Sequence, residues 1–444
     1  MLECILAEKI YRKTYMAITL NIYTISMIIV FIIGYGFITI EHVIRVNKTT
    51  TALLMAIICW ILQFANHHDK FSHQENLDSL AAHVADISQV IFFLIGALSV
   101  VELINAHHGF KIILDVIKVR SKVSLLWLLG LITFFLSAVL DNLTTTLVML
   151  SIMQKLLTNR EDRWLIGGGI VIAANAGGAW TPIGDVTTTM LWIGGQVTSW
   201  AIIKNLFFPS LACFIGSFSI ISQCLKGSLI EHELLNAHKK LEPIGKLIFL
   251  AGIAALIFVP IFKTLTGLPP FMGILFGLGL LWLMTDIAYF KEEDREHLRV
   301  PHVLTKIDLS GVLFFFGILL CINALESAEL LKMLAQWLNQ HVGNTEVIAT
   351  LIGIASAIVD NVPLVAASMG MYSLQQYPQD SSFWQLVAYC AGTGGSLLII
   401  GSAAGVVFMG LEKVDFSWYL KKISFPASVG YMAGITVYYL LSII

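Results

Sequence analysis

Charged residues are scarce in this sequence. Asp, Glu, Lys and Arg together make up 13% of its 444 residues, about half of the share that soluble proteins carry. Hydrophobic residues make up 57%, which leaves too few polar side chains to cover a surface exposed to water. The composition therefore excludes a cytosolic enzyme, a secreted disulfide scaffold and a DNA-binding module, and it indicates a protein that crosses a membrane several times.

The sequence also lacks the common signatures of metal, redox and nucleotide chemistry. Its six cysteines are scattered and form no C-x-x-C pair, so we expect neither a cysteine metal site nor a disulfide framework. No G-x-x-x-x-G-K-[ST] motif occurs, which argues against a bound nucleotide. The net charge is −2 and no basic tract occurs, so nucleic acid is not an expected partner. We expect no cofactor.

Long apolar runs are what the sequence has in abundance. The first run follows Lys9, Arg12 and Lys13, but it is too long for a signal peptide and is predicted to be a transmembrane helix. A span takes about 20 apolar residues, and the sequence predicts an all-α polytopic membrane protein. The expected spans lie near residues 17–40, 50–66, 87–105, 123–153, 165–203, 205–225, 245–262, 270–289, 308–325, 347–374, 383–411 and 424–444.

Three apolar runs have lengths that fit neither one span nor two. Runs 123–153, 165–203 and 347–374 each contain a single charged residue, which is Asp141, Asp185 and Asp360 in turn. A helix that breaks inside a membrane is tolerated only where protein or a water-filled cavity satisfies the freed backbone groups. We therefore expect re-entrant hairpins or broken helices in these runs, with a functional site beside them.

The two halves of the sequence resemble each other. Residues 137–142 (SAVLDN) match residues 356–361 (SAIVDN), and matches in the same order link 52–60 with 274–282, 91–96 with 312–317, and 177–185 with 394–402. Repeats with paired broken segments are typical of secondary transporters. We predict an N-terminal repeat over 1–225, an inter-repeat loop over 226–246 and a C-terminal repeat over 247–444. The residues leave open whether the repeats are parallel or inverted.

The broken segments bring acids, amides and hydroxyls together without bases. A carboxylate inside a membrane costs several kcal/mol unless it is paired, protonated or solvated. Hard cations such as Na⁺ prefer carboxylate, amide, carbonyl and hydroxyl oxygens, and a buried carboxylate can hold either a proton or a metal ion. The candidate cation and proton ligands are Asp141, Asn142, Thr145, Thr181, Asp185, Thr188, Asp360, Asn361, Thr393, Ser396 and Ser402.

Other polar residues have simpler interpretations. The threonine runs are also explained if their hydroxyls bond only to helix carbonyls, and a single membrane aspartate can be a protonated structural group. Glu102 and Glu326 lie near the ends of apolar runs and are interpreted as interfacial. The histidines at 67, 68, 73 and 83 are interpreted as part of a solvated loop over residues 66–85.

Four segments carry a resemblance to a known family. LSAVLDNLTTTLVML (136–150), GGAWTPIGDVTTTMLW (177–192), SAIVDNVPLVAASMGMY (356–372) and GTGGSLLIIGSAAG (392–405) resemble NhaD-type Na⁺/H⁺ antiporters of the ion transporter superfamily. The resemblance implies two inverted repeats, each with a re-entrant hairpin and an unwound helix. It also implies a homodimer in a bacterial inner membrane that exchanges Na⁺ or Li⁺ for H⁺, with the Asp-Asn hairpin tips meeting the unwound segments.

We predict a cation/proton antiporter that works by alternating access, with membrane lipid, Na⁺ or Li⁺, and protons as its partners. Asp141 and Asp360 are predicted to bind Na⁺ and H⁺ competitively, together with Asn142 and Asn361, and Asp185 is a third ligand or a proton-relay acid. The main alternative is a Na⁺-coupled dicarboxylate carrier, which lacks support because no base lies inside the apolar runs. An intramembrane aspartyl protease and a passive channel fit the residues less well, so no enzyme is expected.

Overall fold

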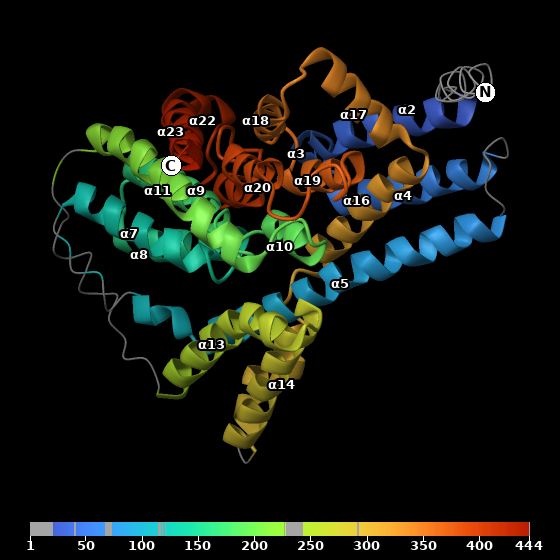
Figure 1. The fold of residues 1–444 in the computed structure, drawn as a ribbon. Coiled ribbons are helices and arrows are strands. Elements are labelled where there is room, and N and C mark those ends of the chain that lie inside the picture. Colours follow the sequence, from blue (N-terminus) through green and yellow to red (C-terminus); the bar gives the residue numbers. More distant parts are fainter. Residues whose placement is uncertain are drawn as a thin grey trace, which may run out of the picture.

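The protein is helical throughout most of the residues that its computed structural model describes, which are 21–39, 41–66, 73–113, 117, 119, 121–225, 227, 243–290 and 293–443. Seven helices in these ranges are long and apolar enough to cross a membrane, which confirms a multi-pass membrane protein. They are α2 (Ile22–Thr39), α4 (Lys48–Ala65), α5 (His73–Ala106), α11 (Ser199–Cys224), α13 (Pro243–Thr266), α14 (Pro270–Ala288) and α16 (Leu309–Ser327) (Figure 1). The start of the expected first span and most of loop 226–246 lie outside the described residues.

Side-chain caps set where many of the helices begin. Asn47 accepts a hydrogen bond from the backbone N–H of Thr49 at the start of α4, and Thr198 accepts one from Ala201 at the start of α11. Such caps satisfy backbone donors that a helix leaves free in its first turn. Other elements around these helices are α3 (Glu41–Ile44), η1 (Gly109–Lys111), η2 (Glu293–Leu298), α15 (Val300–Leu304), α17 (Leu330–His341), α22 (Phe416–Lys422) and α23 (Ser424–Ile443).

Each of the runs expected to break is divided into two helices. The run around Asp141 forms α7 (Lys122–Ser137) and α8 (Asn142–Leu156), and the run around Asp360 forms α18 (Thr345–Ala355) and α19 (Asn361–Met371). The glycine-rich runs form α9 (Arg160–Gly178) with α10 (Val186–Ile193), and α20 (Ser382–Gly394) with α21 (Ala403–Glu412). A short non-helical segment therefore interrupts each of these four runs.

Glycines let the broken helices approach one another closely. A Cβ atom at Gly177 of α9 would clash with the carbonyl oxygen of Phe134 on α7. The same contact recurs in the second half, where a Cβ at Gly394 of α20 would clash with the carbonyl oxygen of Gly353 on α18. No larger residue fits either position, because the obstacle is backbone rather than a movable side chain.

One prediction about the polar segments is wrong. Residues 66–85 are not all loop, because α5 begins at His73 and continues for 34 residues to Ala106. Hydropathy indicates whether a segment prefers lipid, and it does not indicate whether the segment is helical. The first turns of α5 are polar and therefore resemble a loop in the sequence, although they continue the same helix as the apolar part. His83 lies on this part of α5, and its Nε2 is 3.2 Å from the Ser327 Oγ atom of α16. His67 and His68 lie outside the described residues.

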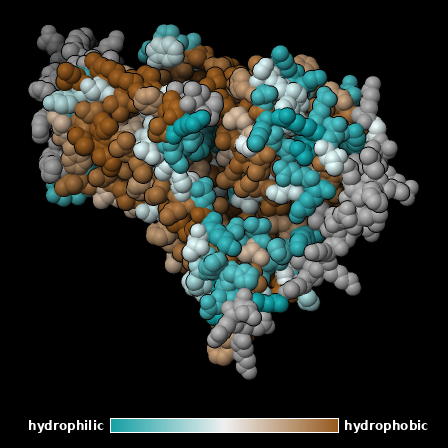
Figure 2. Space-filling view, turned by 180° about the vertical axis from the view of Figure 1, so that it is seen from behind, coloured by the Kyte–Doolittle hydropathy of each residue, from teal (hydrophilic) through white to brown (hydrophobic). Residues whose placement is uncertain are grey.

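Apolar side chains cover the outer faces of the long helices. Seen from behind, the hydrophobic surface gathers at the end of the molecule formed by α2 and α4, while hydrophilic residues gather over the opposite side (Figure 2). Ile22, Ile32 and Ile33 on α2, together with Leu54 and Ile61 on α4, are each more than half exposed. A face of this composition suits lipid rather than water.

Candidate cation and proton site

Four broken helices begin beside one another in the middle of the protein. Asp141 caps α8, Asp185 caps α10, Asp360 caps α19 and Ser402 caps α21, and each side chain accepts a hydrogen bond from a backbone N–H of its own helix. The N-terminus of a helix carries a partial positive charge that stabilises a nearby carboxylate. This arrangement explains how three acids are held in an apolar interior that supplies few bases.

Asp185 is contacted by the asparagines of both matching segments, SAVLDN (137–142) and SAIVDN (356–361). Its carboxylate is 1% exposed, and Oδ1 accepts hydrogen bonds from the backbone N–H and the hydroxyl of Thr187, both at 2.9 Å. Oδ2 accepts one bond from the Asn142 amide at 2.9 Å and another from the Asn361 amide at 3.2 Å. A carboxylate of the first half is thus bound by one amide from each half.

A second buried amide extends this network to the other broken helix. Asn175 of α9 is fully buried, and its Nδ2 donates to the Ser396 hydroxyl at 2.8 Å and to the Ser402 hydroxyl at 2.9 Å. Its Oδ1 accepts a bond from Asn142 at 3.0 Å. The network therefore joins Asp185 to both predicted serines of the segment between α20 and α21.

Asp141 and Asp360 face the same cavity as Asp185. Asp141 accepts bonds from the backbone N–H of Thr144 at 2.8 Å and from its hydroxyl at 2.7 Å, whereas Asp360 accepts a longer bond of 3.4 Å from the backbone N–H of Val362. Both carboxylates are partly buried. The structure thus brings together all three predicted acids, with Asp185 the most deeply buried of them.

The cavity has a volume of about 320 Å³ and is lined by apolar side chains of α5 and α16 together with charged groups. A site of this size is roomy enough for several water molecules. Its charged lining residues are five acids and one base: Glu41, Asp141, Asp185, Asp308, Asp360 and Lys48. Carboxylates in such excess favour a cation over an anion.

The predicted threonine ligands fall into two groups. Those of Thr181, Thr188 and Thr393 donate to backbone carbonyls, namely Ala138 at 2.6 Å, Asp185 at 2.9 Å and Tyr389 at 2.6 Å. These three therefore have the partners that a purely structural role would give them. By contrast, the buried Thr145 hydroxyl has no hydrogen-bond partner within the part of the chain that the structure describes.

Comparison with known proteins relates these features to a family. A family model described as a citrate transporter matches residues 27–392. Sodium/proton antiporter 2 of Arabidopsis thaliana is 49% identical over 93% of this chain and 98% of its own length, and sodium/proton antiporter 1 of that plant is 51% identical over 93% and 72%. The Na⁺/H⁺ antiporter NhaD of Vibrio cholerae serotype O1 is 27% identical over 94% and 91%.

The chain belongs to the NhaD-type sodium/proton antiporter family. This membership confirms the resemblance seen in four motifs, since the relatives cover nearly the whole chain. The family is one of transporters rather than enzymes, which removes the aspartyl protease from the alternatives. A carrier of dicarboxylates or related anions remains the alternative to test, because the matching family model is named after a transporter of citrate, a carboxylate anion.

The two halves make matching contacts around the site, but they supply different residues to its centre. The Ser137 hydroxyl donates to the Ala174 carbonyl at 2.6 Å, and the Ser356 hydroxyl donates to the Ala391 carbonyl at 2.9 Å. At the position that corresponds to Asp185, however, the second half has Ser402. Only the first half therefore supplies an acid at the centre of the network, and the second half supplies a hydroxyl.

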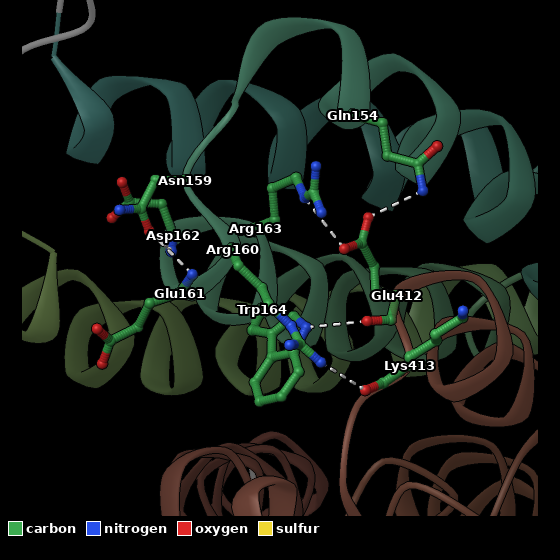
Figure 3. A network of polar contacts seen from close by, with 9 residues as sticks. All are labelled: Gln154, Asn159, Arg160, Glu161, Asp162, Arg163, Trp164, Glu412 and Lys413. Carbon is green, nitrogen blue, oxygen red and sulfur yellow. Dashed lines mark hydrogen bonds and ion pairs between the residues drawn. The ribbon is translucent and has the colours of Figure 1, made fainter.

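The C-terminal end of α21 is fixed by a separate polar network (Figure 3). The Glu412 carboxylate is buried and accepts bonds from Arg163 Nε at 3.1 Å and from Gln154 Nε2 at 2.9 Å. The Trp164 indole donates to the Glu412 carbonyl at 3.1 Å, and Arg160 lies over the Trp164 ring. These contacts attach the end of α21 to α8 and α9, so its N-terminus is held beside Asn175.

The end of α10 is held in a comparable way. The Lys263 ammonium of α13 donates to the carbonyl oxygen of Trp192 at 2.7 Å and lies 4.4 Å from the centre of the Trp192 ring. A cation at the C-terminus of a helix is favourable because the carbonyls there carry partial negative charge. Both α10 and α21 therefore have an N-cap residue at the site and a basic side chain at the C-terminal end, which is Lys263 for α10 and Arg163 for α21.

Two residues outside the predicted ligand set belong to the site. Asn175 and Thr187 both bond directly to its members, yet neither is among the candidate ligands drawn from the sequence. The sequence feature that could identify Asn175 is that it is a polar residue in the otherwise apolar second half of α9, ten residues before Asp185. Thr187 follows from the rule that a capping aspartate accepts bonds from the first turn of its helix.

Proposed function

We propose that this chain exchanges Na⁺ or Li⁺ for H⁺ across a membrane by alternating access. The observation that carries the proposal is the position of Asp185, a deeply buried carboxylate that opens onto an acid-lined cavity and receives amides from both halves. A carboxylate in this environment is occupied by a proton or by a cation, because a bare charge is unfavourable there. Competition between Na⁺ and H⁺ for this carboxylate, and for those of Asp141 and Asp360 in the same cavity, couples the two ions.

The amides supply a way to change between the two occupants. In the structure Asn142 and Asn361 present their NH₂ groups to Asp185. A half-turn of each amide would present oxygen instead, and amide oxygens are ligands for hard cations. Asp141 and Asp360 are the predicted Na⁺ and H⁺ ligands nearer the cavity, and Asp185 is the third acid behind them.

Two inverted repeats, each with a re-entrant hairpin and an unwound helix, form the framework of the proposal. Its support is the recurrence of the breaks, of the glycine contacts and of the serine-to-carbonyl bonds in both halves. We assign residues 1–225 to the first repeat, 226–246 to the loop between the repeats and 247–444 to the second.

A second cavity supports alternating access over an open channel. It has a volume of about 390 Å³ and is lined by the polar part of α5, the end of α16, and parts of α10 and α19. The acid-lined cavity reaches the start of α16 and the N-termini of α10 and α19 instead. The two cavities therefore lie toward opposite ends of α16, and movement of α10 and α19 would change which one reaches Asp185.

The assembly and the host membrane are also proposals. A homodimer in a lipid bilayer fits the broad apolar faces of α2 and α4. A bacterial inner membrane fits relatives such as NhaD of Vibrio cholerae, whereas the two Arabidopsis thaliana relatives come from a plant. Cross-linking in native membranes and fractionation of the source cells would test these two points.

The experiment for the exchange itself is a pH-gradient dequenching assay in everted membrane vesicles. Na⁺, Li⁺ and K⁺ are added in turn to vesicles that contain the wild type or Asp141→Asn. We expect Na⁺ or Li⁺ to collapse the gradient in the wild type and not in the variant. Absence of any response between pH 6 and 9 would exclude cation/proton exchange and favour the dicarboxylate carrier, which uptake of a labelled dicarboxylate would then detect.

A further inference from the structure

Lys48 is the one basic residue among the described residues that line the acid-lined cavity. The other charged groups there are five carboxylates, so the ammonium of Lys48 stands alone in a strongly negative environment. Neither the predicted site nor the proposed exchange gives this residue a task.

The structure holds the Lys48 side chain in a defined place. Lys48 is the first residue of α4, and its backbone N–H donates to the Glu41 carboxylate at 3.1 Å. Its ammonium lies 4.4 Å from the centre of the Phe314 ring on α16. A cation over an aromatic face is attracted by the ring, so a flexible side chain is kept at the wall of the cavity.

Lys48 also lines a neighbouring cavity that reaches the same acids. This cavity has a volume of about 340 Å³ and includes Glu41, Asp360 and Ser402 in its lining. Asp360 and Glu41 therefore belong to both cavities, and Lys48 lies where the two meet. An ion that approaches Asp360 through either cavity therefore passes a wall to which Lys48 contributes.

We propose that Lys48 is a specificity-determining residue that makes the cavity selective for monovalent over divalent cations. The inference rests on the proposed cation exchange. Several carboxylates around one space are the ligand set that Ca²⁺ uses, so an acid-lined cavity needs some means to exclude it. A tethered ammonium repels every cation that enters, and it repels a divalent cation twice as strongly as a monovalent one.

The doubling gives a quantitative expectation. If removal of the ammonium tightens Na⁺ binding by a certain factor, the same change tightens binding of a divalent cation by about the square of that factor, because Coulomb energy is proportional to charge. A change of about threefold for Na⁺ would accompany one of about ninefold for Ca²⁺. A residue with only a structural role would not produce this relation.

The test compares Lys48→Met, which keeps the stem over Phe314 but loses the charge, with Lys48→Arg, which keeps the charge. Lys332→Met is the matched control, because Lys332 lies on the surface beside Glu329. In proteoliposomes we would measure the KM for Na⁺ and the inhibition constant for Ca²⁺. We expect both constants to fall in Lys48→Met, the second by about the square of the first, and to stay near wild type in the other two.

Three outcomes would overturn the inference, and they differ from failure of the exchange. Unchanged constants in Lys48→Met would show that the charge does not act on the ion, and equal effects of Lys48→Arg and Lys48→Met would show that shape matters instead. If Lys48→Met does not fold, Phe314→Leu frees the ammonium, and unchanged constants there would overturn the inference as well. Wild-type protein without Na⁺-dependent proton movement would overturn the proposed function itself.

Discussion

The two amides at Asp185 provide the sharpest quantitative prediction. Asn142→Ala removes a 2.9 Å bond to the carboxylate and a bond to Asn175, whereas Asn361→Ala removes bonds of 3.2 and 3.4 Å. In the proposed ion-bound state each amide presents its oxygen to the cation, and a polar contact with a charged group contributes about 1.5–3 kcal/mol. Loss of that contact corresponds to a binding constant weaker by about 10- to 150-fold. We expect the KM for Na⁺ to rise by at least about tenfold in Asn142→Ala and by less in Asn361→Ala.

The assay is cation-dependent collapse of a pH gradient over a range of Na⁺ concentrations. Asn105→Ala is the control, because Asn105 is a surface residue of α5 that bonds only weakly to Glu102. An Asn142→Ala protein with wild-type KM would refute the argument that the amide contributes to ion binding. A larger effect of Asn361→Ala than of Asn142→Ala would refute the ranking by geometry.

Three further changes test the framework of the site. Gly177→Ala should lower the free energy of unfolding by about 1–3 kcal/mol, because the added Cβ atom would clash with backbone. Gly36→Ala is the control and should leave the free energy of unfolding unchanged, because no atom lies within 4 Å of the added Cβ. Thermal unfolding in detergent compares the two variants. Glu412→Gln should lower the free energy of unfolding by less than the about 3–5 kcal/mol lost when a fully buried ion pair is broken, since Arg163 is 28% exposed; an unchanged free energy of unfolding would show that the ion pair does not stabilise the fold. Thr145→Val should leave unfolding unchanged, because the hydroxyl has no partner among the described residues, and a raised KM for Na⁺ would identify it as a ligand.

The breaks in the helices could be predicted from the sequence because their cause is local. A single acid within an apolar run, and a run too long for one span, both require the backbone to leave the helix where polar groups can be satisfied. Asp141, Asp185 and Asp360 accordingly cap new helices at the expected positions. The repeat stays a prediction, supported by contacts that recur in both halves.

The centre of the network could not be read from the sequence in the same way. Which carboxylate receives both amides depends on how α8, α10 and α19 pack, and the spacing of Asp141, Asp185 and Asp360 along the chain carries no information about it. Hydropathy does not reveal the polar start of α5 for a different reason: a helix that extends beyond the lipid loses its apolar pattern but keeps its backbone hydrogen bonds. Lys48 reaches the site only because α4 packs against α16.

Asp185 is the carboxylate on which the proposed exchange depends most directly, because it is expected to hold either a proton or a cation. The measurement is proton release on addition of Na⁺ to purified protein in weakly buffered detergent solution, with wild type and Asp185→Asn compared. We expect the wild type to release protons in proportion to bound Na⁺, and Asp185→Asn to bind Na⁺ far more weakly and release none. Proton release by Asp185→Asn at the wild-type level would contradict the central role of this carboxylate.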